Sequence, residues 1–115
     1  MAQQPETLLQ RRFQKRLKLI KGLHYVNIQQ QSLRGHADFF MCAGGWSIHV
    51  ELKKCEKLSP SKQQQLNLDK HERAGGYSLV GNPQNIEELT DFIREVVINK
   101  ERLEIPKCLQ SRRKL

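Results

Sequence analysis

Apolar side chains recur every three or four positions near the start of the chain, which is the spacing of one helix face. This stripe comprises Leu9, Phe13, Leu17 and Ile20. Pro5 suits a first helical turn and Gly22 suits a helix end, so we predict a helix over residues 5–21.

Three segments with strand character follow at 24–29, 37–41 and 46–53. Small, turn-prone residues at 42–45 separate the last two of these strands, which predicts a hairpin. A short fourth strand is predicted at 77–80.

Two further helices are marked by their ends. Ser59-Pro60 offers an N-cap with a first-turn proline, and Gly75-Gly76 offers a stop, which predicts a helix over 60–74. Asn85 followed by Glu88 resembles a capping box and predicts the start of a last helix, which ends near residue 99. The order αβββαβα predicts an α/β fold with a small mixed sheet flanked by helices.

The composition, 115 residues with 37% hydrophobic and 28% charged, is that of a soluble protein with one core. We assign residues 1–105 to this domain and 106–115 to a basic tail. The N-terminal sequence lacks an apolar signal segment, and no apolar run approaches the roughly 20 residues of a membrane helix. The spacing of Cys42, Cys55 and Cys108 fits neither a disulfide framework nor a zinc motif, so we expect free thiols and a cytoplasmic protein without membrane partners.

The net charge of +8 comes from 20 Lys and Arg against 12 Asp and Glu. Residues 1–73 hold 13 basic and six acidic side chains, so the excess lies mainly in the first two thirds of the chain. A basic run is often only a solvated helix face. A bias maintained over this length instead favours an acidic polymer as partner, with nucleic acid the first candidate.

Three ionisable residues of the predicted hairpin are candidates for catalysis. Glu51 and Lys53 are two positions apart, so they share the strand face opposite the apolar Val50 and Leu52. Asp38 would lie across from them, because opposed Cβ atoms are only about 4.5–5.5 Å apart. Two carboxylates and a lysine suit hard-metal chemistry on phosphate esters. The pattern leaves an exposed cross-strand salt bridge open as the alternative.

Three more positions bear on this site. Glu6 continues the apolar stripe of the first helix, although a first-turn glutamate is also favoured by the helix dipole. Gly35 permits close backbone approach ahead of Asp38. Gln64 carries an amide that can hold a metal-bound water or a phosphate oxygen, with an exposed polar residue as the alternative.

In this order and spacing the residues resemble the VRR-NUC branch of the PD-(D/E)XK nuclease superfamily, and its small stand-alone phage and bacterial members in particular. The shared motifs are G-x-x-D at 35–38, I-H-V-E-L-K at 48–53, and L-S-P with a glutamine-bearing helix ending in A-G-G at 58–76. Ala37 stands where the family commonly has proline.

The resemblance implies a restriction-endonuclease-like core and Mg²⁺, with Mn²⁺ as a substitute and no small-molecule cofactor. The implied metal ligands are Asp38, Glu51, Glu6 and the Leu52 carbonyl oxygen. Lys53 is implied as the catalytic lysine. Gln64 is implied as the helix glutamine, and the adjacent Gln63 and Gln65 leave that position open by one residue.

The expected function is therefore a metal-dependent endodeoxyribonuclease, with basic side chains gripping backbone phosphates. The expected DNA contacts are Arg11, Arg12, Lys15, Arg16, His36, Lys54, Lys57, Arg112, Arg113 and Lys114. No added domain is available to read bases, so we expect branched or double-stranded DNA as substrate. The similarity to Holliday-junction resolvases implies a homodimer. The alternative function is a non-catalytic basic module that binds nucleic acid.

Overall fold

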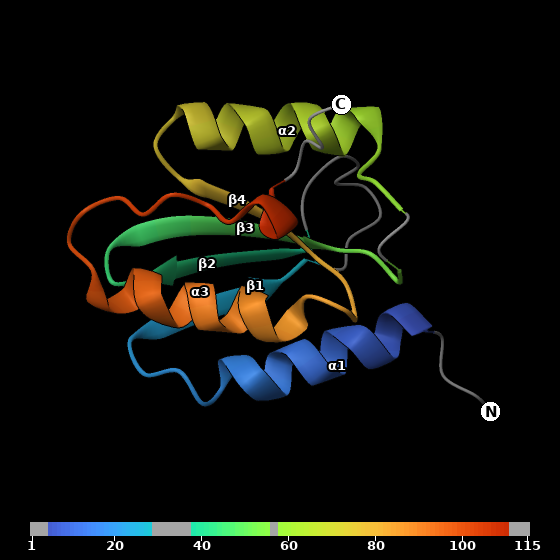
Figure 1. Ribbon diagram of the computed structural model, residues 1–115, viewed down its shortest axis with the longest axis horizontal. Helices are drawn as coiled ribbons and strands as arrows, with labels where there is room; N and C mark the ends of the chain where they lie inside the picture. The colour runs from blue at the N-terminus through green and yellow to red at the C-terminus, as the bar shows by residue number, and fades with distance from the viewer. Residues whose placement is uncertain (1–4, 29–37, 56–57, 111–115) are drawn as a thin grey trace.

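The computed structural model describes residues 5–28, 38–55 and 58–110 (Figure 1). Its elements are, in order, α1 (Pro5–Leu17), β1 (Leu23–Asn27), β2 (Phe39–Ala43), β3 (Trp46–Leu52), α2 (Lys62–Arg73), β4 (Tyr77–Gly81), α3 (Ile86–Ile98) and the 3₁₀ helix η1 (Lys107–Leu109). The predicted α/β class and the order αβββαβα are confirmed.

The four strands form one mixed sheet in the order β1-β2-β3-β4. The pairs β1–β2 and β2–β3 are antiparallel, and β4 runs parallel to β3. Parallel neighbours need a crossover connection, and α2 supplies it. In Figure 1, α2 covers one face of the sheet, while α1 and α3 lie side by side on the other.

The main core lies between the sheet and the α1–α3 layer. Phe13 of α1 packs edge-on against Phe39 of β2, with ring centroids 5.0 Å apart and both side chains fully buried. The helix stripe and the alternating strand residues therefore bury the same core, as their periodicity predicts. A smaller apolar cluster, formed by Leu68, Val80 and Phe40, lies under α2.

Two predicted helix boundaries are wrong, one by four residues and the other by two. Helix α1 ends at Leu17 rather than at residue 21, because Leu19 and Ile20 donate backbone hydrogen bonds three residues back and Ile20 turns into the core. Helix α2 begins at Lys62, with Ser61 rather than Ser59 as its N-cap. A helix end is decided by local hydrogen bonds that several nearby sequence positions could satisfy.

The capping box predicted for the last helix is also wrong. The Asn85 side chain makes no cap hydrogen bond to α3. Its Oδ1 accepts from the Asn82 N–H at 2.8 Å, and its Nδ2 donates to the carbonyl oxygens of Val80 and Cys108. The preceding turn and η1 therefore take this side chain away from the start of α3.

The strand boundaries differ from the prediction by one or two residues, and the hairpin is tighter. β2 continues to Ala43, which pairs with Trp46, so only Gly44 and Gly45 form the turn. Both have positive φ, 60° and 91°, as a two-residue type I′ turn requires.

The packed domain extends beyond the boundary predicted at residue 105. Ile105 and Leu109 belong to the main core, and Leu109 is fully buried. Residues 106–110 are therefore part of the domain, and the rest of the predicted tail lies outside the described residues. In the part of the chain that the structure describes, no helix combines the length and apolar character needed to cross a membrane.

Candidate active site at the end of the hairpin

Asp38 precedes β2 by one residue and is tied to both neighbouring strands. Its backbone carbonyl accepts from the Ile28 N–H at 2.7 Å, and its Oδ2 accepts from the Leu52 N–H at 2.8 Å. Phe39 pairs with Val50, so Asp38 lies level with Glu51 just beyond the paired stretch. The hairpin therefore brings the Asp38 carboxylate to the Glu51–Leu52 peptide, as the register predicts.

Glu51 lies on the face of β3 that α2 covers. It pairs with Val80 of β4, which contacts Leu68 of α2, and the residue is 1% exposed. The prediction placed Glu51 opposite the main core, but an exposed cross-strand salt bridge does not describe a residue buried in this way. Because the ionised form of a buried carboxylate is costly, a positive charge brought beside it, such as a metal ion, stabilises that ionised form.

Lys53 follows β3 directly and shares the side of Glu51. Its backbone N–H donates to the Gly81 carbonyl oxygen at 2.8 Å, which continues the ladder toward β4. Its Nζ donates to Gln64 Oε1 at 3.1 Å. Lys53 is therefore held at both ends, by the sheet and by α2.

Of the three consecutive glutamines at 63–65, Gln64 is the one that faces Lys53. Gln63 is exposed, and Gln65 donates to Asp69 Oδ1 within α2 at 3.0 Å. Gln64 Oε1 accepts a second hydrogen bond, from the Ser61 N–H at 2.9 Å. Since the amide oxygen already accepts twice, the chemistry left to this side chain is donation from Nε2, which suits a phosphate or water oxygen.

The carboxylates of Asp38 and Glu51 are the candidate metal ligands among the described side chains. The residues that the structure describes include no group of three or more His, Cys, Asp or Glu that could hold a metal ion. Two carboxylates nevertheless fit Mg²⁺, which keeps several waters and is often held by one or two carboxylates. Glu6 belongs to α1, but its side chain lies outside the described residues, as does Gly35.

No protein-family model matches this chain, and comparisons with curated proteins and with solved structures give no significant match. The geometry of the site therefore carries the functional argument.

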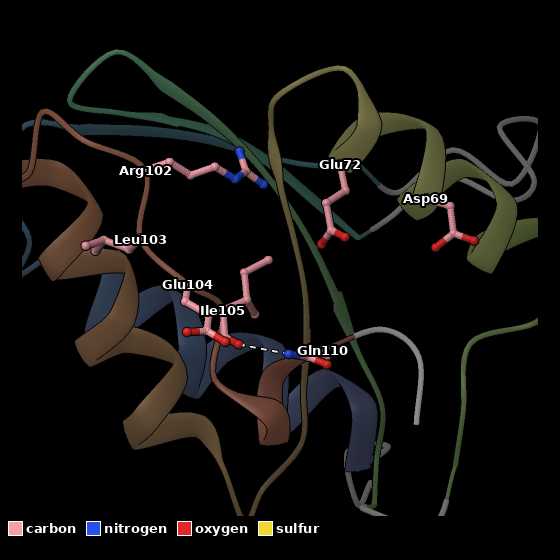
Figure 2. A pocket seen from close by; sticks show the side chains of 7 residues that line it. All are labelled: Asp69, Glu72, Arg102, Leu103, Glu104, Ile105 and Gln110. Atoms are coloured by element: carbon pink, nitrogen blue, oxygen red, sulfur yellow. Dashed lines mark hydrogen bonds between the residues drawn. The ribbon is translucent and has the colours of Figure 1, made fainter. Parts of the chain in front are cut away.

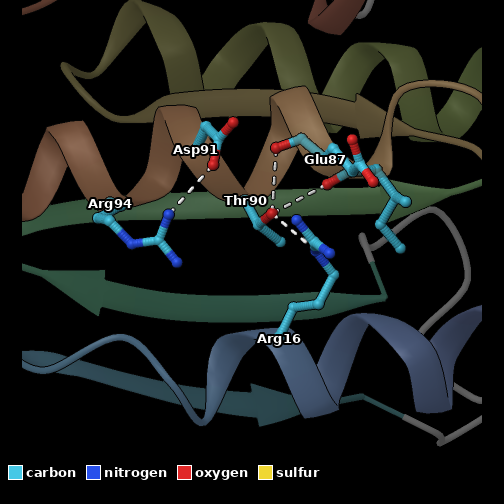
Figure 3. A network of polar contacts seen from close by, with 6 residues as sticks. Arg16, Glu87, Thr90, Asp91 and Arg94 are labelled. Carbon is cyan, nitrogen blue, oxygen red and sulfur yellow. Dashed lines mark hydrogen bonds and ion pairs between the residues drawn. The ribbon is translucent and has the colours of Figure 1, made fainter.

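The basic residues predicted to bind DNA fall into separate groups. Arg11, Arg12 and Lys15 are exposed along α1, and Lys54 is exposed just after the site. Arg16 differs from them because its Nε donates to Thr90 Oγ1 of α3 at 2.9 Å (Figure 3). Arg16 therefore joins the two helices of one layer. The remaining predicted contacts, His36, Lys57, Arg112, Arg113 and Lys114, lie outside the described residues.

Next to the site is a ring stack that the spacing of the histidines does not predict. His49 of β3 stacks on Phe40 at 4.2 Å and on His71 of α2 at 3.4 Å between ring centroids. Burial lowers the pKa of His71, and the positive charge of Arg102 lowers it further. A hydrogen bond to the Ser47 carbonyl oxygen offsets part of this shift. Alternation along β3 could have placed His49 on the Glu51 face, but no sequence signal places His71 against it.

A pocket of about 330 Å³ opens elsewhere, between α2 and the segment that follows α3 (Figure 2). Its lining comprises Asp69, Glu72, Arg102, Leu103, Glu104, Ile105 and Gln110. Arg102 also donates to the carbonyl oxygens of Gly75 and Gly76, which fastens this segment to the turn after α2. The pocket contains none of the predicted site residues.

Proposed function

We propose that this chain is a metal-dependent endodeoxyribonuclease of the PD-(D/E)XK type. One observation carries the proposal: the Leu52–Asp38 and Lys53–Gln64 hydrogen bonds gather two carboxylates, a lysine and an amide at the end of β3. The sequence predicts that these residue types form one site, although they come from separate segments of the chain. A VRR-NUC-type nuclease uses the same combination, which supports the assignment.

The proposed site divides the work among its side chains. Asp38 and Glu51 would hold Mg²⁺, and the resemblance to the family adds the Leu52 carbonyl oxygen and Glu6. When bound, Mg²⁺ would supply a Lewis acid for the phosphodiester and would lower the pKa of a bound water. Lys53 places a positive charge where negative charge develops on the phosphate, and the Gln64 amide donates to a phosphate or water oxygen.

The proposed substrate is DNA held through its backbone. The exposed Arg11, Arg12 and Lys15 of α1, with Lys54 beside the site, supply sequence-independent phosphate contacts. Such contacts favour a substrate chosen by structure, such as branched or double-stranded DNA. We include a homodimer in the proposal, because one such chain carries one site and resolution of a junction cuts two strands.

Cleavage assays test the proposal. The chain is incubated with supercoiled plasmid, a four-way junction and a linear duplex, each with Mg²⁺, Mn²⁺ or EDTA. We expect cleavage with either metal and none with EDTA. Asp38→Asn and Lys53→Ala should each lower the rate by about 100-fold or more, since the first removes a proposed metal ligand and the second removes the positive charge beside the phosphate.

The control is Asp91→Asn, which removes an exposed carboxylate that pairs with Arg94 on α3 and should leave the rate unchanged. Thermal unfolding of each variant shows that it is folded. If neither Mg²⁺ nor Mn²⁺ supports cleavage while the chain still binds DNA in a salt-dependent way, the chain is the non-catalytic binding module of the alternative.

A further inference from the structure

We propose that Ser61 is a positioning residue for Lys53, acting through the Gln64 carboxamide. The proposal rests on the function proposed above, because it assigns a role within the same site. It adds a residue that no motif of the sequence singles out. The chain of contacts runs from the N-cap of α2 to the ammonium group of Lys53.

Ser61 and Gln64 form a reciprocal capping box. Ser61 has extended backbone angles, φ −62° and ψ 165°, and its Oγ accepts from the Gln64 N–H at 3.2 Å. In return, the Ser61 N–H donates to Gln64 Oε1 at 2.9 Å. The two bonds together fix both the first turn of α2 and the direction of the Gln64 side chain.

The same Oε1 atom accepts from Lys53 Nζ at 3.1 Å. An amide oxygen has two lone pairs, and here donors from β3 and from the N-cap occupy both. Since each neighbour can only donate, the amide must present its oxygen to them, which excludes the flipped orientation. Lys53 is therefore linked to the start of α2 through one atom whose position Ser61 determines.

A lysine side chain needs such a link to act at a defined place. Its four-carbon stem is flexible, and a catalytic group must be held to within about 0.5 Å of its working position. An ordinary capping box stabilises only its own helix. This capping box also supplies the hydrogen-bond acceptor for a site residue on the neighbouring sheet.

Three variants separate positioning from general stability. Ser61→Ala removes the Oγ acceptor and leaves the backbone N–H in place. Ser61→Thr keeps a hydroxyl at the N-cap and should restore the parent behaviour. Ser59→Ala is the matched control, because Ser59 is also an exposed serine ahead of α2 but is not the N-cap.

Two measurements read the variants. The first is steady-state cleavage of a four-way junction with Mg²⁺. Ser61→Ala should lower kcat about fivefold, which is the factor equivalent to the free energy of a lost N-cap hydrogen bond. KM should stay within about twofold of the parent value, since the phosphate contacts are untouched.

The second measurement is proton exchange at the Lys53 ammonium, followed by ¹⁵N NMR without DNA or metal. Exchange should be faster in Ser61→Ala than in the parent, Ser61→Thr and Ser59→Ala.

The proposal is overturned if Ser61→Ala keeps the parent kcat, if its loss appears in KM alone, or if Lys53 exchange does not change. It is also overturned if Ser59→Ala has the same effect, which would make the loss one of helix stability. A parent chain that cleaves no DNA overturns the proposed function and with it the catalytic role of Lys53. The exchange measurement then still decides whether Ser61 orders that side chain.

Discussion

The thiol of Cys108 is held in its protonated form by its surroundings. Its Sγ donates to Glu88 Oε2 at 2.8 Å. The pKa of Cys108 is raised to about 11. Burial is the largest cause, followed by the hydrogen bond to Glu88 and by the negative charge of Glu88. A thiol is a nucleophile only as the thiolate, so Cys108 should resist alkylation although it is exposed.

This resistance is measurable by mass spectrometry after treatment with iodoacetamide at pH 8. We expect Cys108 to react at least about 100-fold more slowly than a free thiol, because its thiolate fraction at this pH is smaller by about that factor. Glu88→Gln removes the negative charge and should speed the reaction. An unchanged rate in that variant would show that Glu88 does not control the thiol.

The residues of the candidate site differ in how far sequence could predict them. Asp38, Glu51 and Lys53 belong to one hairpin, so alternation and register suffice to bring them together. The choice of Gln64 over its neighbours depends on where α2 begins, and the N-cap lies two residues later than the sequence indicates. The burial of Glu51 depends on α2 crossing above it, which no local pattern contains.

Helix α2 is attached to the sheet at three levels along its length. Gln64 holds Lys53 at its start, and Ser78 Oγ of β4 donates to the Leu68 carbonyl oxygen at 2.6 Å in its middle. Near its end, His71 stacks on His49. At the last of these contacts the pKa of His71 is lowered, chiefly by burial.

Acidification should therefore weaken the fold through His71. Its pKa is lowered in the folded chain, so the unfolded chain binds the proton more readily and stability falls as pH drops below about 6.5. The groups that face the ring are His49, Ser47 and Arg102. The measurement is the free energy of unfolding in urea between pH 5 and pH 8.

His71→Gln should reduce the loss of stability on acidification, because it removes the group that takes up the proton. His24→Gln, which changes an exposed histidine of β1, is the control and should keep the parent slope. Equal slopes in the parent and in His71→Gln would assign the pH dependence to other groups.

At the scale of elements, the helix stripes and strand alternation are strong enough to predict every helix and strand of the main fold. Their ends are less predictable, because competing polar side chains can satisfy the same backbone groups. Asn85 shows this most clearly, since its side chain bonds to Val80 and Cys108 instead of capping α3. The contact with Cys108, 23 residues away, cannot be inferred from residues near Asn85 in the chain.

The whole domain is completed by the segment that follows α3. Arg102 lies 4.6 Å from the centroid of the Tyr77 ring, and the Leu103 N–H donates to the Tyr77 hydroxyl at 2.7 Å. Leu109 then enters the main core. Charge alone suggested a separate tail from residue 106, but burial shows that the segment through Gln110 is structural.

Truncating Leu109 tests this role for the segment. Leu109→Ala should lower the free energy of unfolding by about 2–5 kcal/mol, as expected for a fully buried leucine. Leu19→Ala is the control, because Leu19 is 77% exposed and should cost no more than about 0.5 kcal/mol. Chemical denaturation measures both, and a loss below about 1 kcal/mol for Leu109→Ala would mean that the segment is not part of the cooperative core.

The two-glycine turn has a consequence for how the chain can change in length. Gly44 and Gly45 lie at the opposite end of the hairpin from Asp38, yet the turn determines the register in which β2 meets β3. A slip by one residue would turn Asp38 toward the other face of the sheet and away from Glu51. Surface turns usually tolerate insertions and deletions. In this chain the same slip would also turn Phe39 and Met41 out of the main core, so the length of the turn is constrained by the fold and by the candidate site together.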